Sequence, residues 1–285
     1  MDKECFENNL KQLGDDFGKY GKLYFCTNEN LKDYIPDLTN KKTLTVSASG
    51  DHLLNCACNG ATYIDTFDVN YYSSLYQELK IQAALNLDDD ELYTFYEYLY
   101  YPTYTRLREN LSDKAKELFD FLFHNYSNSQ IMNLLFYPRD VNSKDVNNYY
   151  IDGRLDVLRD NLRRLVHNHF YTNLYNLPYF LEDKYDTLFF SNISHYSEPE
   201  SFISYLQYLS DYFLNDNGEI YFGYIYNTNG VKTATDGIKH ISDKYNQCKD
   251  LKNFAKCVEI KVIDSAEYSG SKDAVLVYKK EKTGE

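Results

Sequence analysis

Residues 43–87 read TLTVSASGDHLLNCACNGATYIDTFDVNYYSSLYQELKIQAALNL, and this stretch decides the fold. It opens on a β-branched run that leads straight into Ser49-Gly50-Asp51. An apolar helical stretch follows, and Gly60 is placed to end that helix as a left-handed cap. A second β-branched run then ends at Asp68. The order of strand, tight turn, helix and strand predicts the opening of a parallel βαβ unit.

Beyond this unit the chain alternates between helix and strand, with one long interruption. From residue 71 the apolar spacing becomes helical, and no strand-like run returns until about residue 165. An uninterrupted α/β alternation would reach its next strand much earlier, so we interpret 90–165 as a helical insertion without internal repeats. The later strands are expected at 165–171, 185–190, 219–226, 258–263 and 274–278.

These elements predict an α/β fold with a Rossmann-like, mostly parallel sheet and an antiparallel element near its end. Residues 1–40 form an N-terminal helical or irregular segment, 41–89 and 166–285 form the Rossmann-like domain, and 90–165 form the insertion. Ligands of such sheets bind beyond the carboxyl ends of the strands. We therefore expect the insertion to cover that edge.

Composition limits the classes of partner. The 285 residues contain 43 acidic and 30 basic side chains, with a formal net charge of -13. Phosphate backbones and anionic membranes are bound by clustered Lys and Arg, so we predict neither nucleic acid nor anionic lipid as a partner. Small molecules, cationic substrates and neutral lipids fit better.

The chain start is charged and no run approaches the roughly 18 apolar residues of a membrane span, so a soluble, cytoplasmic protein is expected. The six cysteines contain no CxxC pair. Free thiols in a reducing compartment, and no metal site, are the expectation.

Three strand ends carry the candidate site. The first is Ser47-Ala48-Ser49-Gly50-Asp51, whose small residues allow close approach of a ligand at a helix N-terminus. The second is Asp68, 18 residues after Gly50, near the spacing at which an acidic residue binds ribose hydroxyls. The third is Ser191-Asn192. Taken singly, the first is also explained as a turn and the second as a solvated strand end, but their order and spacing together favour a ligand site. GxGxxG and GxxxxGK[ST] motifs are absent.

These residues carry a resemblance. Residues 43–87 resemble the cofactor-binding half of class I S-adenosylmethionine-dependent methyltransferases. More narrowly, they are similar to the S-adenosylmethionine:diacylglycerol 3-amino-3-carboxypropyltransferase family and its uncharacterised bacterial relatives. The shared features are the SASGD turn, the FDVN strand end, the ELKIQAAL helix and, later, LFFSNI at 188–193. The resemblance covers about half of the chain.

The resemblance implies S-adenosylmethionine as the cofactor. The implied cofactor-binding set is Ser47, Ser49, Gly50, Asp51, Asp68, Val69, Asn173, Leu174, Ser191 and Asn192. The turn after the first strand would line the methionine end, Asp68 would hold the ribose, and Val69 would lie beside the adenine. Asn173-Leu174 would lie near the adenine amino group, where such folds usually place an acidic residue. Ser191-Asn192 would face the reacting end.

Some features depart from the family or compete with it. The lipid enzymes carry a Trp-Glu-Asp-Pro-like motif before the first strand, whereas this chain has Asn28-Glu29-Asn30-Leu31 there and no Trp. His195 and Tyr196, in an expected loop, are candidates for substrate contact or plain loop residues. For His52, at a helix start, a capping or solvent role is expected.

Three further patterns have structural explanations. His167 and His169 are expected at a strand edge rather than in a nuclease-like site. The acidic run at 88–91 is expected to cap a helix rather than bind a metal. The aromatic run at 93–104 either lines a pocket or, as we favour, packs the insertion against the sheet.

The preferred function is S-adenosylmethionine-dependent transfer, of a 3-amino-3-carboxypropyl group, to a small-molecule or neutral lipid acceptor. One alternative is methyl transfer by the same cofactor. The other is a non-catalytic cofactor-binding or scaffold protein. No catalytic residue is assigned, because orienting a nucleophile on the electrophilic sulfonium supplies much of the rate.

Overall fold

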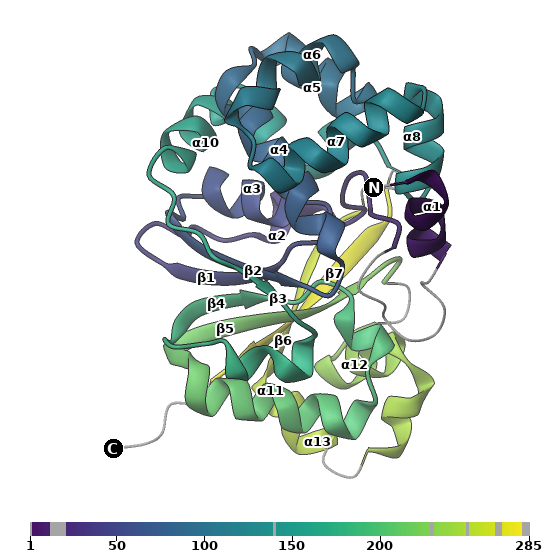
Figure 1. The fold of residues 1–285 in the computed structure, drawn as a ribbon. Coiled ribbons are helices and arrows are strands. Elements are labelled where there is room, and N and C mark those ends of the chain that lie inside the picture. Colours follow the sequence, from purple (N-terminus) through teal and green to yellow (C-terminus); the bar gives the residue numbers. More distant parts are fainter. Residues whose placement is uncertain are drawn as a thin grey trace.

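A computed structural model describes residues 2–11, 21–138, 141–228, 231–248, 251–265 and 270–280. A central sheet lies between two layers of helices (Figure 1). Its strands are β1 (Lys42–Val46), β2 (Tyr63–Asp68), β3 (His169–Tyr171), β4 (Tyr185–Phe189), β5 (Leu214–Ile225), β6 (Val258–Asp264) and β7 (Lys272–Lys279).

The strand order is β3-β2-β1-β4-β5-β7-β6. The first five strands are parallel, and β7 pairs antiparallel with both β5 and β6. The predicted fold class is therefore confirmed: the sheet is Rossmann-like and mostly parallel, of the class I methyltransferase type, with its antiparallel element at the end of the chain. The chain proceeds outward from β1 to β3 and returns on the other side at β4. The topological switch thus lies between β1 and β4.

Helices cover both faces of the sheet (Figure 1). The α-helices are α1 (Lys3–Lys11), α2 (Leu31–Tyr34), α3 (Asp51–Cys58), α4 (Tyr71–Asn86), α5 (Asp89–Tyr98), α6 (Tyr101–Leu107), α7 (Asp113–Asn125), α8 (Asn128–Leu135), α9 (Ser143–Val146), α10 (Arg154–Leu162), α11 (Pro199–Phe213), α12 (Ala234–Ile241) and α13 (Leu251–Phe254). The 3₁₀ segments are η1 (Arg108–Asn110), η2 (Asn148–Tyr150), η3 (Leu174–Tyr179), η4 (Ile193–Tyr196), η5 (Asp243–Gln247) and η6 (Ala255–Cys257). Figure 1 shows α3, α4 and the insertion on one face and α11, α12 and α13 on the other.

The insertion lies elsewhere than expected. Its helices α5, α6 and α7 pack on α4, and α10 packs on α3 and α4, so most of it forms an outer layer over the helices (Figure 1). The physical reason is visible in α4, which is buried nearly all round and therefore needs cover on the side away from the sheet. Near the end of the insertion, the Tyr149 hydroxyl donates to Asp51 in the turn after β1, and Leu135 and Tyr137 pair through their backbones with Leu23 of the N-terminal segment.

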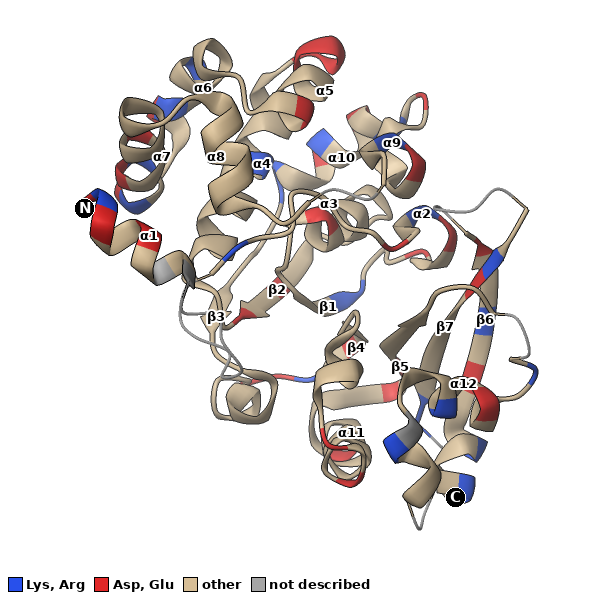
Figure 2. Ribbon diagram, turned by 90° about the vertical axis from the view of Figure 1, so that its right-hand side faces the viewer, with Lys and Arg blue, Asp and Glu red and all other residues tan. Residues whose placement is uncertain are grey.

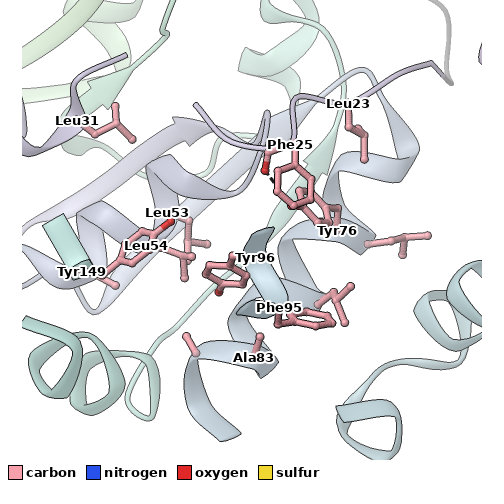
Figure 3. Close-up of a cluster of buried hydrophobic side chains, with 14 of the residues drawn as sticks. Leu23, Phe25, Leu31, Leu53, Leu54, Tyr76, Ala83, Phe95, Tyr96 and Tyr149 are labelled. Atoms are coloured by element: carbon pink, nitrogen blue, oxygen red, sulfur yellow. Dashed lines mark hydrogen bonds between the residues drawn. The ribbon is translucent and has the colours of Figure 1, made fainter. Parts of the chain in front are cut away.

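On the face of the sheet that α3 and α4 cover, the hydrophobic core is continuous from the sheet into the insertion. Figure 3 shows Leu53 and Leu54 of α3, Tyr76 of α4 and Tyr96 of α5 packed in one cluster. The Tyr76 hydroxyl donates a hydrogen bond of 2.8 Å to the carbonyl oxygen of Phe25, which ties the N-terminal segment to the same cluster. The insertion and the Rossmann-like half therefore share apolar packing on this face.

A buried ion pair lies at the centre of this layer. The Lys80 ammonium of α4 is 2.5 Å from Asp51 Oδ1 at the start of α3, and both side chains are inaccessible to solvent. The same carboxylate accepts hydrogen bonds from the Thr27 amide (2.7 Å), the Ser49 hydroxyl (2.9 Å) and the Tyr149 hydroxyl (2.8 Å). One carboxylate therefore links four separate segments of the chain.

The substitution Lys80→Met should destabilise the protein strongly, because it leaves a buried carboxylate without its cation. Removing one partner of such a pair costs about 3–5 kcal/mol in the free energy of unfolding. Urea denaturation measures the loss. Lys239→Met, on the exposed surface of α12, is the matched control and should change stability by less than about 0.5 kcal/mol. Equal stability of the two variants would contradict the importance of the pair.

Candidate functional site

The three sequence-predicted strand ends meet at one edge of the sheet. β1 lies between β2 and β4, and all three run in the same direction, so their carboxyl ends are neighbours. The turn 47–51 follows β1, Asp68 ends β2, and Ser191 follows β4 by two residues. The structure thus brings the three predicted segments together at the topological switch, where α/β sheets bind ligands.

The turn after β1 is tight, and most of its side chains face the protein. Ala48 and Gly50 have positive φ angles of 45° and 82°. A Cβ on Gly50 would stand 3.2 Å from the Cα of Gln77, so glycine is needed here for the close approach of α4 as well as for its φ. The Ser47 hydroxyl donates to Gln77 Oε1 (2.8 Å), and Ser49 donates to Asp51. Only Ala48 of 47–51 is partly exposed.

The sequence predicts that Ser47, Ser49 and Asp51 line the cofactor site, but their side chains point into the protein. Their side chains are occupied by protein partners and buried, so they shape the turn from within. What this turn can offer a ligand is its backbone and the Cβ of Ala48. Sequence spacing identified the turn but not the direction of its side chains, which the packing of α4 determines.

Asp68 is the predicted site residue with the clearest geometry. Its Oδ2 accepts the Ala48 amide and its Oδ1 accepts the Asn70 amide, both at 2.9 Å. Burial raises the pKa of Asp68 to about 6, although these backbone hydrogen bonds favour the charged form. The side chain is partly exposed, and hydrogen bonds from the Ser73 side chain and the Val69 amide also favour its charged form. Val69 beside it is also partly exposed.

Asn173 and Leu174 occupy the start of η3 after β3. The Asn173 side-chain oxygen caps η3 by accepting the Asn176 amide at 2.9 Å. Leu174 is buried in the core on the α11 face, and its carbonyl accepts the Tyr205 hydroxyl. The Leu174 side chain therefore packs inward, and only the exposed Asn173 faces solvent near the end of β3.

Ser191 and Asn192 are held by hydrogen bonds at the end of β4. Ser191 has a positive φ of 51°, a costly conformation that recurs at functional sites. Its hydroxyl donates to Glu29 Oε1 at 2.5 Å. Asn192 Oδ1 accepts the Tyr224 amide (3.2 Å), and its Nδ2 donates to the Tyr226 hydroxyl (3.1 Å). Asn192 therefore fixes this loop to β5, while Ser191 points to the N-terminal segment.

Ser191 leads to a buried cluster that was not predicted as part of the site. Glu29 is 1% exposed, and its Oε2 accepts the Tyr34 hydroxyl (2.7 Å) and lies 3.4 Å from His52 Nε2. Burial by itself would raise the pKa of Glu29, but the hydrogen bond and the charge interaction with His52, together with hydrogen bonds from Ser191 and Tyr34, hold it below the usual value. His52 is also 1% exposed, so the expected solvent role was wrong: the N-terminal segment covers it.

The available sequence signal for this cluster was the stretch Asn28-Glu29-Asn30-Leu31. This stretch departs from the motif of the lipid enzymes, and no pattern around Glu29 links it to the strand ends. Sequence spacing alone does not bring residue 29 to residue 191, because the two are connected only through the fold.

His195 and Tyr196 lie in η4, just beyond Ser191, and both are exposed. Burial lowers the pKa of His195, while the charge of Glu29 acts in the opposite direction. Tyr196 hydrogen-bonds the Tyr24 hydroxyl, whose pKa is raised to about 12 by burial and by the neighbouring tyrosines. Tyr24 in turn packs on Tyr137 of the insertion, with ring centroids 5.2 Å apart. The outer rim of the site is thus aromatic.

Basic residues are distributed over many elements of the described chain. Figure 2 shows Lys and Arg on many elements, among them α4, α6, α7 and α10, and acidic residues occur between them. Within the described ranges, no three His, Cys, Asp or Glu side chains gather in a way that could hold a metal ion. In the same part of the chain, no helix combines the length and the hydropathy needed to cross a bilayer.

Comparison with known proteins identifies no family. No protein-family model matches the chain, and no curated protein is significantly similar to it. Solved structures match weakly. An rRNA methylase from Streptococcus thermophilus is 8% identical, with a TM-score of 0.35, over 86% of this chain and 90% of the other. SMU.1697c from Streptococcus mutans, solved in complex with S-adenosylhomocysteine, is 8% identical, with a TM-score of 0.35, over 95% and 97%.

The fibrillarin/Nop5p complex matches at 10% identity and a TM-score of 0.34, over 84% of this chain and 72% of the other. Overlap at this level carries no argument about cofactor, substrate or partner.

His167 and His169 lie beside the sheet edge, as expected, and share one partner. Thr66 Oγ1 is 2.9 Å from His167 Nε2 and 2.9 Å from His169 Nδ1. Burial lowers the pKa of each imidazole to about 4. Both rings are therefore neutral in the folded protein at neutral pH.

This pair predicts acid destabilisation. The folded pKa of each ring lies below the unfolded value of 6.5, so their contribution is complete above that value and is lost as the pH falls towards 4. Between about pH 7.5 and about pH 5, each ring should remove about 1–2 kcal/mol from the free energy of unfolding. In urea titrations His169→Gln should reduce this pH dependence, while the exposed control His124→Gln should not. An unchanged dependence in His169→Gln would refute the assignment.

Proposed function

We propose that this protein is an S-adenosylmethionine-dependent transferase whose cofactor lies across the carboxyl ends of β2, β1 and β4. The observation that carries the proposal is the Asp68 carboxylate. It ends β2, accepts the Ala48 amide of the neighbouring turn, and is partly exposed to solvent. A carboxylate in that position is suited to two adjacent hydroxyl donors, such as the 2′ and 3′ hydroxyls of a ribose.

The positions of the strand ends support a cofactor that extends along this edge of the sheet, from β3 to β4. Neighbouring strands lie about 4.8 Å apart, so Ser191 after β4 is about two strand spacings from Asp68 after β2. With a ribose at Asp68, the residues that follow β1 and β4 would hold the methionine end of the cofactor, and Val69 and the end of β3 would lie on the adenine side. The tight turn at Ala48 and Gly50 allows the ligand to approach the backbone between them.

S-Adenosylmethionine, when bound, supplies an electrophilic carbon attached to a cationic sulfur. The part of this chain is to hold the cofactor and to orient an acceptor in line with one carbon–sulfur bond. The acceptor forms a new bond to that carbon, the bonding electron pair leaves with sulfur, and the acceptor proton passes to solvent. Transfer can proceed without a dedicated base when the acceptor is already nucleophilic.

The resemblance of SASGD, FDVN and FSNI to the carboxypropyl transferases favours transfer of the 3-amino-3-carboxypropyl group. That reaction breaks the bond between sulfur and the methionine γ-carbon and leaves methylthioadenosine. The alternative, methyl transfer, leaves S-adenosylhomocysteine. The acidic chain and the aromatic rim of Tyr24, Tyr137 and Tyr196 suit a small-molecule or neutral lipid acceptor rather than a nucleic acid.

Asp68→Asn should weaken S-adenosylmethionine binding by about tenfold or more, because hydrogen bonds to a charged acceptor contribute about 1.5–3 kcal/mol. Wild-type affinity should also fall as the pH drops below about 6, where this carboxylate becomes protonated. Titration calorimetry measures both effects.

The matched control is Asp186→Asn, since Asp186 also accepts a neighbouring backbone amide, that of Lys42, but at the amino end of β4. It should bind the cofactor normally. Equal affinity of Asp68→Asn and wild type would reject the ribose assignment, and no binding by folded wild-type protein would reject the proposed cofactor.

The two transfer reactions are separated by their nucleoside products. Incubation of the protein with S-adenosylmethionine and a cell extract should release methylthioadenosine above the level of a heat-inactivated control, as resolved by mass spectrometry. Enzyme-dependent S-adenosylhomocysteine without methylthioadenosine would instead establish methyl transfer. Neither product from protein that binds the cofactor would favour a non-catalytic role.

A further inference from the structure

We propose that Glu29 is the counter-charge of the cofactor's sulfonium, so that this chain discriminates between positively charged S-adenosylmethionine and its neutral thioether product. This inference rests on the proposed function. It assigns to the buried carboxylate a role in selecting the charged form of the cofactor.

Glu29 is a buried carboxylate that has no Lys or Arg partner among the described residues. Glu29 is 1% exposed and hydrogen-bonded to two hydroxyls, those of Tyr34 and Ser191. Among the described residues no Lys or Arg forms an ion pair with it, whereas the equally buried Asp51 is paired with Lys80. A buried charge requires a compensating charge, and here the protein supplies hydroxyl dipoles but no fixed cation.

Among the described residues, His52 is the basic side chain in direct contact with Glu29. Its Nε2 lies 3.4 Å from Glu29 Oε2, but its Nδ1 is buried without a hydrogen-bond partner. A protonated imidazole carries an N–H on both nitrogens, so protonation would bury a donor with no acceptor. His52 is therefore an incomplete partner for the charge of Glu29.

Glu29 also lies on the side of the topological switch where the proposed cofactor would carry its sulfonium. Ser191, the residue that touches Glu29, follows β4 on the far side of the switch from Asp68. With the ribose at Asp68, the sulfonium falls near β1 and β4, beside the Ser191–Glu29 pair. The hydroxyls of Tyr34 and Ser191 occupy the carboxylate, so Glu29 acts through its field rather than by direct contact. Such a field is strong where water is excluded.

A negative charge near the sulfur would favour binding of the cationic cofactor over its neutral analogue. S-Adenosylmethionine and S-adenosylhomocysteine share the adenosine, the ammonium and the carboxylate, and they differ in the methyl group on sulfur and in the positive charge that it brings. An uncompensated carboxylate beside that atom strengthens binding of the cationic form only. After transfer, the sulfur becomes neutral and this attraction disappears, which promotes release of the thioether product.

Calorimetry on the full chain with S-adenosylmethionine, S-adenosylhomocysteine and sinefungin tests the inference. In sinefungin an amine-bearing carbon replaces the sulfonium, and the amine is cationic at neutral pH. Wild-type protein should bind S-adenosylmethionine and sinefungin at least about tenfold more tightly than S-adenosylhomocysteine, where tenfold corresponds to about 1.4 kcal/mol. This comparison needs no variant, so a folding defect cannot obscure it.

Glu29→Gln keeps the shape of the side chain and removes its charge. It should lose at least about tenfold in affinity for the two cationic ligands and change less than about threefold for the neutral one. Glu29→Asp retains the charge and should preserve the preference. Two controls separate charge from architecture: Tyr34→Phe removes a hydrogen bond from Glu29 without changing its charge, and Asp65→Asn neutralises another buried carboxylate, in β2.

Equal losses for charged and neutral ligands in Glu29→Gln would make Glu29 purely structural and overturn the inference, as would wild-type binding of S-adenosylhomocysteine as tight as that of S-adenosylmethionine. In both cases the proposed cofactor stands. Failure of folded wild-type protein to bind any of the three ligands is a different result, because it overturns the proposed function itself.

Discussion

The ion pair between Asp51 and Lys80 is the constraint on which the rest of the site depends. Two opposite charges are removed from water, and the carboxylate is satisfied only because Thr27, Ser49 and Tyr149 also donate to it. These donors come from the N-terminal segment, the turn after β1 and the insertion. Losing any one of them leaves part of a buried charge unsatisfied, so the segments are held together.

The aromatic surroundings strengthen this arrangement. The Lys80 ammonium lies 5.2 Å from the ring centroids of both Tyr76 and Tyr96, which gives it cation–π contacts where water is absent. The ion pair also helps to fix the segment that reaches the topological switch. Glu29 lies two residues beyond Thr27, so the bond from the Thr27 amide to Asp51 also fixes the start of the loop that carries Glu29 to Ser191.

Two carboxylates at this edge have different environments and therefore different uses. Asp68 is held by backbone amides and remains partly open, which suits an acceptor for ligand hydroxyls. Glu29 is enclosed by hydroxyls and an imidazole, which suits a fixed negative field. We therefore propose that the Asp68 carboxylate contacts the ligand directly, whereas the Glu29 carboxylate acts through its negative charge. The difference arises because burial and hydrogen-bond partners determine what a carboxylate can do.

The sequence by itself determined the order of strands and helices, the turn at Gly50 and the acidic end of β2. These follow from periodicity, β-branching and glycine placement, which act over a few residues. It also indicated the antiparallel end of the sheet and the helical character of 90–165. Only the tertiary structure decided that α4 is buried nearly all round and is covered by the insertion, that Ser47 and Ser49 face inward, and that residue 29 meets residue 191. Those outcomes depend on which faces pack together and which buried charges find partners, and such long-range requirements leave no local pattern in the chain.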